Sequence, residues 1–96
     1  MSRQIGWARV DGRSILFTES CREALSGKWF DVRVNTVKGF ISLAENQGEH
    51  SKRISSNKKQ VRLYSLAACS RMGSAVEAQG RLPVYEKRPG LYYIKF

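Results

Sequence analysis

Basic side chains crowd one polar stretch of the sequence, where they could bind phosphate groups. Lys52 and Arg53 open this stretch. Lys58, Lys59 and Arg62 follow, and no acidic residue occurs between residues 52 and 59. Lysine and arginine can contact the phosphates of a nucleic acid without reading its bases. We therefore interpret the stretch as a flexible arm that follows a phosphate backbone, and a solvated loop that only aids solubility is the alternative.

Three arginines nearer the N-terminus form a second candidate set. Arg9 and Arg13 flank an Asp11-Gly12 turn, and Arg22 falls on a predicted short helix. In a symmetric dimer such arginines occur twice and could straddle a groove of duplex DNA. Exposed arginines without a ligand are the alternative.

Tyrosines and basic residues alternate near the C-terminus, a combination that also occurs on sheets that bind single-stranded nucleic acid. The predicted hairpin there carries Tyr85, Tyr92 and Tyr93 beside lysines and an arginine. Exposed aromatic rings stack on bases while neighbouring cations contact phosphates. The run Lys38-Gly39-Phe40 matches the start of a basic and aromatic strand motif with the same use. We favour packing within the sheet for both segments, and single-strand binding is a third hypothesis.

Residues that could support catalysis or hold a cofactor are scarce. His50 lies in the polar stretch, where no neighbour fixes its tautomer, and Cys21 and Cys69 lie on apolar-rich segments. We interpret both cysteines as small buried residues in a reducing compartment, rather than as nucleophiles or a disulfide. One histidine and two separated cysteines do not supply a four-ligand zinc site without carboxylates. The sequence therefore predicts no enzyme, no metal site and no cofactor.

The overall charge favours a polyanionic partner. The 96-residue chain carries 17 Lys+Arg against 8 Asp+Glu, a formal net charge of +9, which is typical of nucleic-acid-binding proteins. Residues 1–48 hold seven basic and five acidic residues, whereas residues 49–96 hold ten and three. We expect the second half to contribute more to binding. Because neither a membrane span nor a signal peptide is evident, we expect a cytoplasmic protein with no membrane partner.

The elements that must position these residues follow from apolar patterning and turn residues. Hydrophobic residues make up 42% of the chain, enough for a single domain over residues 1–96. Short helices are expected at 18–25 and 65–72. Alternation and turn signals predict strands at 4–10, 13–17, 29–35, 40–44, 61–64, 81–87 and 91–96. The predicted core consists of Ile15, Phe17, Leu25, Phe30, Val32, Val34, Ile41, Leu43, Leu63, Leu66, Val84, Leu91, Tyr93 and Ile94.

The two halves of the chain have the same order of elements. A strand, a short helix, a strand, a turn and a strand occur within residues 1–44 and again within 61–96, on either side of a basic polar loop at 45–60. An offset of 47 aligns Phe17 with Tyr64, and an offset of 51 aligns the hairpins that follow. We interpret this as two βαββ units and predict a small β-rich α+β domain, in which both units and their short helices pack into one barrel-like core. Chance similarity of short βα segments is the alternative.

The run from Gly12 to Glu19, with Arg22 and Leu25 after it and then Asp31-Val32-Arg33-Val34, resembles the swapped-hairpin domain of AbrB- and MazE-like DNA-binding proteins. The resemblance implies βαββ units that interlock in pairs, in regulators and antitoxins that bind DNA as dimers. It also implies DNA contacts from arginines near the turn and the helix. Here Arg13 matches the arginine after the turn glycine, Arg22 approximately matches the helix arginine, and Arg9 is near the basic position of the first strand.

These patterns together predict a non-enzymatic nucleic-acid-binding protein, a small transcription regulator of bacterial or phage type with duplex DNA as its partner. Phosphate contacts are expected to dominate its affinity. The alternative is a small phage or mobile-element protein that binds and inhibits a host protein or nucleoprotein complex, and a homodimer fits either function. The candidate site residues are Arg9, Arg13, Arg22, Lys52, Arg53, Lys58, Lys59 and Arg62.

Overall fold

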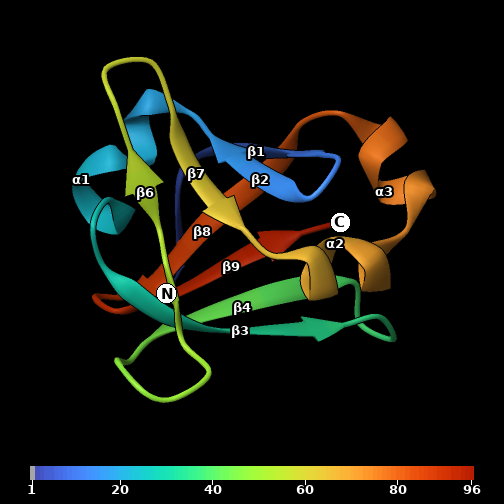
Figure 1. The fold of residues 1–96 in the computed structure, drawn as a ribbon. Helices are drawn as coiled ribbons and strands as arrows, with labels where there is room; N and C mark the ends of the chain where they lie inside the picture. Colours follow the sequence, from blue (N-terminus) through green and yellow to red (C-terminus); the bar gives the residue numbers. More distant parts are fainter. Residues whose placement is uncertain (1) are drawn as a thin grey trace.

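Antiparallel strands form one sheet that curls until its two edges nearly meet (Figure 1). The computed structural model describes residues 2–96. The strands lie in the order β5-β3-β4-β9-β8-β1-β2-β7-β6. Each predicted strand is present, with its ends displaced by no more than one residue. The strands are β1 (Arg3–Asp11), β2 (Ser14–Phe17), β3 (Trp29–Asn35), β4 (Phe40–Glu45), β5 (Lys52–Arg53), β6 (Ser55–Ser56), β7 (Val61–Tyr64), β8 (Leu82–Arg88) and β9 (Leu91–Lys95).

The segment 52–56 brings the two edges of the sheet together. Its first half, β5, pairs with β3, and its second half, β6, pairs with β7. Ile54 lies between these halves and is completely buried. Its backbone N–H donates to the carbonyl of Lys28 over 3.0 Å, and its carbonyl accepts from the N–H of Gly27 over 2.8 Å. The result is a nearly closed, barrel-like sheet in a β-rich α+β fold.

The expected loop at 45–60 is therefore in part a piece of the sheet. The Asp31 carboxylate holds the residues before β5 in place, because it accepts hydrogen bonds from Ser51 Oγ (2.8 Å) and Asn46 Nδ2 (2.9 Å). The bond from Asn46, followed by that from Ser51, lowers the pKa of Asp31. Ser51 Oγ also accepts from the N–H of Gly48 over 2.9 Å. The polar composition of this segment predicted a loop. It could not indicate the strand pairing, because the hydrogen-bonding partners of the segment are remote in sequence.

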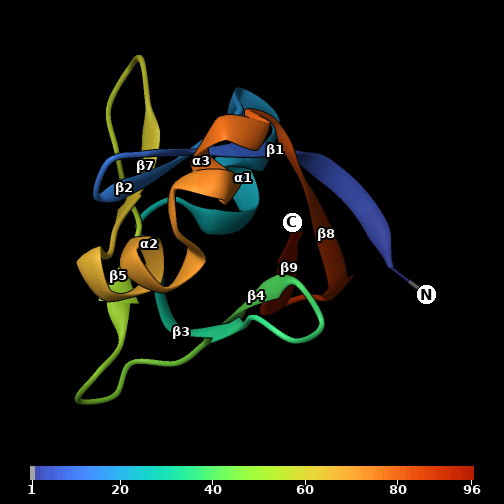
Figure 2. The ribbon, with the colours of Figure 1, turned by 90° about the vertical axis from the view of Figure 1, so that its right-hand side faces the viewer.

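Short helices cover opposite ends of the barrel. They are η1 (Glu19–Cys21), α1 (Arg22–Leu25), α2 (Leu66–Met72) and α3 (Ser74–Gln79). Figures 1 and 2 place α1 at one end and the pair α2 and α3 at the other. Ser65 caps the N-terminus of α2, because its Oγ accepts a hydrogen bond from the N–H of Ala68 over 3.3 Å. None of the helices within residues 2–96 has the length and hydropathy needed to cross a membrane.

The core fills the barrel, and one strand presents the opposite face from that predicted. Most predicted core residues are buried, and Val32 packs against them while partly exposed. Leu66 is 50% exposed on the first turn of α2. In β9, Tyr92 and Ile94 point into the core, whereas Leu91 and Tyr93 lie on the outer face. Alternation could not decide this strand because large side chains occupy consecutive positions from residue 91 to 94.

Truncation of Ile54 to alanine is expected to destabilise the barrel by about 2–5 kcal/mol, the usual cost of such a change in a core. Lys52→Ala removes an exposed side chain from the adjoining strand and is the control, with an expected change of about 0.5 kcal/mol or less. Urea unfolding followed by circular dichroism measures both. Equal stability of the two variants would contradict the closing role of Ile54.

Candidate nucleic-acid interface

Two of the predicted arginines lie on one outer face of the barrel. Arg9 is paired with Leu16 across β1 and β2, and Leu16 is paired with Arg62 across β2 and β7. Residues paired in this way share one face of the sheet. The neighbours of Arg9 in β1, Ala8 and Val10, are buried, so alternation directs Arg9 outward. Two strand spacings separate the arginines, about 10 Å between backbones.

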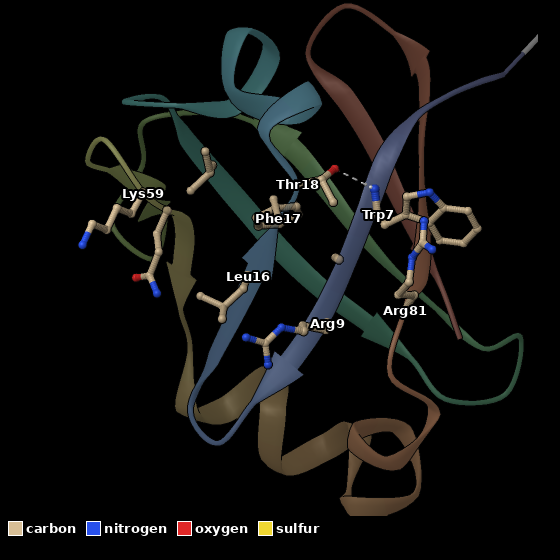
Figure 3. A pocket seen from close by; sticks show the side chains of 10 residues that line it. Trp7, Arg9, Leu16, Phe17, Thr18, Lys59 and Arg81 are labelled. Atoms are coloured by element: carbon tan, nitrogen blue, oxygen red, sulfur yellow. Dashed lines mark hydrogen bonds between the residues drawn. The ribbon is translucent and has the colours of Figure 1, made fainter.

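A tryptophan and a third arginine flank this row. The guanidinium carbon of Arg81 lies 4.2 Å from the ring centre of Trp7, a cation–π contact. Thr18 fixes Trp7, because its N–H donates to the Trp7 carbonyl over 2.9 Å while its Oγ1 accepts from the Trp7 N–H over 3.1 Å. The main chain of Trp7 is therefore held where β2 ends beside β1, and its ring carries the Arg81 guanidinium on the outer face (Figure 3).

The turn between β6 and β7 brings a lysine to the opposite side. Asn57 Oδ1 accepts hydrogen bonds from the N–H groups of Lys59 (2.8 Å) and Gln60 (2.9 Å), which folds the turn tightly. Figure 3 shows Lys59 and Arg81 at opposite sides of a surface hollow, with a volume of about 250 Å³. Arg62 lies beside the hollow, paired with Leu16 on the same face, and does not line it. We call the surface formed by Trp7, Arg9, Leu16, Lys59, Arg62 and Arg81 the cationic cleft. Among the residues described, no acidic side chain lines this hollow.

The other predicted site residues lie apart from the cleft or beside it. Lys58 is exposed in the same turn as Lys59, whereas Arg13 is exposed at the turn between β1 and β2. Lys52 and Arg53 lie in β5 and are paired with β3. Arg22 is held by Glu19, with Nε–Oε1 and Nη2–Oε2 distances of 2.6 and 2.9 Å. This hydrogen-bonded pair lowers the pKa of Glu19 and raises that of Arg22.

Trp7 and Arg81 were not among the predicted site residues. Trp7 and Arg9 are two positions apart on β1, so the sequence predicts that they share one face of this strand. Arg81 had no such signal, because its contact with Trp7 depends on the pairing of β1 with β8, which lie far apart in the sequence. The sheet therefore assembles the cleft from four separate segments.

Groups suited to nucleophilic or metal chemistry are buried or dispersed. Cys21 and Cys69 are free and buried, and burial raises the pKa of both thiols. His50 is exposed in the segment between β4 and β5. Within residues 2–96, no group of three or more His, Cys, Asp or Glu residues is placed to hold a metal ion.

Comparisons of the chain with family models, curated proteins and solved structures give no significant match.

Both thiols are expected to react slowly with Ellman's reagent at mildly alkaline pH in the native protein. Burial excludes the reagent and the raised pKa values reduce the thiolate fraction, so the rate should be roughly tenfold or more below that in urea. Absorbance at matched pH with and without denaturant provides the comparison. A native rate equal to the denatured rate would show an accessible, reactive cysteine.

Proposed function

We propose that the protein is a non-enzymatic nucleic-acid-binding protein that contacts the phosphates of duplex DNA through the cationic cleft. The supporting observation is the hollow lined by Arg9, Lys59 and Arg81, with Arg62 on the same outer face beside Leu16 and no acidic residue in the lining among residues 2–96. Cations gathered in this way raise the local concentration of a polyanion and release its counterions on binding.

The spacing of the arginine row suits a phosphate backbone. Arg9 and Arg62 stand about 10 Å apart at the backbone, and their side chains are long and exposed. Duplex DNA carries one charge per about 3.4 Å of axis on each strand, so both guanidinium groups can reach one backbone. The Trp7–Arg81 stack places a third guanidinium at the same hollow. Such contacts position a protein on DNA, and one arginine turned into the groove could add base recognition.

A role in transcription regulation belongs to the same proposal. A small protein without a catalytic centre acts on DNA by occupying it, and the resemblance to swapped-hairpin regulators suggests the same role. That resemblance assigns the DNA contacts to Arg13 and Arg22, whereas the geometry favours the cleft. Arg22 would have to leave Glu19 to bind a phosphate.

We also propose that the barrel is built from two equivalent units. The structure favours a different alignment of the two units from the one that the sequence suggested. At an offset of 47, the buried Phe17 aligns with Tyr64, which is 55% exposed, so the two strands would present opposite faces. An offset of 48 removes this conflict. It aligns Ile15 with Leu63, both of which are completely buried and paired with each other. An approximate two-fold axis through this pair relates β2 to β7.

The hairpins that follow support the same two-fold relation. Val32 is paired with Leu43 between β3 and β4, and Val84 is paired with Ile94 between β8 and β9. The offset is 52 between β3 and β8 and 51 between β4 and β9. The irregularity in β8 between residues 86 and 88 adds one residue to that strand, and the turn at 89–90 is two residues shorter than the turn at 36–39, so the offset falls by one from the first strands to the second.

The strand that precedes each unit extends the equivalence. β1 lies between β2 and β8, and the segment 52–56 lies between β7 and β3. The pairings with β8 and β3 align Ala8 with Lys52, because their partners Leu82 and Phe30 are themselves equivalent. The pairing of β1 with β2 and the pairing of β6 with β7 give the same offset of 44 between β1 and the segment 52–56. Each proposed unit is therefore ββαββ, and one chain supplies both halves of the core without a dimer.

Replacing Arg9 and Arg62 with glutamine is expected to weaken duplex binding and to reduce the slope of log K against log salt by about 1.8, since each phosphate contact contributes about 0.9. Fluorescence anisotropy with a labelled duplex over a range of salt concentrations measures the slope.

Two further variants make this experiment specific. Lys28→Gln/Arg88→Gln removes the same charge from a different hollow, which these residues line together, and it should leave the slope nearly unchanged. Arg13→Gln/Arg22→Gln tests the assignment implied by the resemblance. An unchanged slope in the Arg9 and Arg62 variant, or equal losses in all three, would contradict the cleft as the DNA site. A stable complex with a protein, together with weak binding to DNA, would favour the host-inhibitor alternative.

A further inference from the structure

A second row of side chains crosses the barrel on the far side from the cationic cleft. Arg33, Ser42, Tyr93 and Tyr85 are paired in succession across β3, β4, β9 and β8. In the closed strand order, β4 and β9 lie opposite β2 and β7. Tyr93 was expected in the core, but it shares the outer face with these residues because Tyr92 and Ile94 point inward.

Aromatic rings form the centre of this second face. Phe40 and Tyr93 meet edge to face, with ring centres 5.2 Å apart and planes inclined by 85°. Tyr85 is paired with Tyr93 on the adjacent strand. All three rings are partly exposed. Tyr92 differs, because it is only 2% exposed and its ring packs against Phe30 in the core.

Lysines surround these rings without acidic partners. Lys95 is paired with Phe40, Lys87 follows Tyr85 by two positions on β8, and Lys38 precedes β4. These side chains line one surface hollow of about 580 Å³, which no acidic residue lines within residues 2–96. None of the three lysines forms an ion pair in that part of the chain. We call Phe40, Tyr85, Tyr93, Lys38, Lys87 and Lys95 the aromatic platform.

We propose that the aromatic platform binds single-stranded nucleic acid, independently of the cationic cleft. Bases stack on the rings of Tyr85, Tyr93 and Phe40, and the lysines contact the flanking phosphates. Intramolecular packing accounts for the Phe40–Tyr93 contact, but it leaves three lysines around a hollow that no acidic residue lines in the described part of the chain. A strand of phosphates supplies that charge, and its bases supply flat partners for the rings.

The geometry selects a single strand over a duplex. Within a duplex the faces of the bases are stacked on one another, so aromatic side chains reach them only where bases are splayed out. The rings lie on three adjacent strands, β4, β9 and β8, which span about 10 Å. This width accommodates about two or three bases. Since stacking depends on the π-face that all bases share, the site is expected to tolerate many sequences.

The test is a titration of the full chain with a fluorescein-labelled oligothymidine, followed by anisotropy. Tyr93→Ala is expected to weaken binding by about 5- to 150-fold, the usual effect of losing one stacked base. Tyr64→Ala is the matched control, because Tyr64 is an exposed tyrosine on β7, away from the platform. Tyr93→Phe keeps the ring and should retain binding.

A charge variant covers the case in which Tyr93→Ala fails to fold. Lys87 and Lys95 are exposed, so Lys87→Gln/Lys95→Gln should fold normally and reduce the single-strand salt slope by about 1.4. Duplex binding by these variants should be unchanged, and single-strand binding by Arg9→Gln/Arg62→Gln should persist. Three outcomes would each overturn the proposal: no binding of the oligothymidine, equal weakening of that binding by Tyr64→Ala, or a loss of single-strand binding only in the Arg9→Gln/Arg62→Gln variant. None of these outcomes bears on duplex binding at the cleft.

Discussion

Closure of the sheet at Ile54 is the constraint on which the rest of the molecule depends. An open sheet would expose unpaired N–H and C=O groups at both of its edges. Here the segment 52–56 pairs with both edges, and Ile54 anchors it in the core. Once the sheet has curled in this way, its inner face is filled by apolar side chains. Every residue that could bind a ligand through the sheet must then lie on the outer face.

Side chains alternate between the inner and outer faces along each strand. This alternation consequently decides which residues can act together. Arg9, Leu16 and Arg62 come from three strands, yet their pairing places them in one row. The same rule turns Tyr93 outward and Tyr92 inward on β9. A shift of one residue in either strand would exchange the core and the surface. The hydrogen-bond register is thus the direct cause of both proposed surfaces, which explains why surfaces with different chemistry can occupy opposite walls of one small barrel.

The sequence was informative wherever patterning is local. Alternation located every predicted strand, because each such strand has at least one clear turn signal or polar face. It failed for the segment 45–60, where Ile54 is the only large apolar side chain and the partners of β5 and β6 are remote. It also failed for Leu91 and Tyr93, since both faces of β9 carry large residues. The Trp7–Arg81 contact was beyond reach because it depends on a long-range strand pairing.

The separation of two binding faces is the central claim, and two-dimensional ¹H–¹⁵N NMR titrations test it most directly. With duplex DNA, we expect chemical-shift changes at the amides of Trp7, Arg9, Leu16, Arg62 and Arg81. With a single-stranded oligonucleotide, we expect changes at Phe40, Tyr85 and Tyr93. Two largely separate sets of perturbed amides would support two binding faces. One shared set for both ligands, or changes confined to other residues, would contradict them.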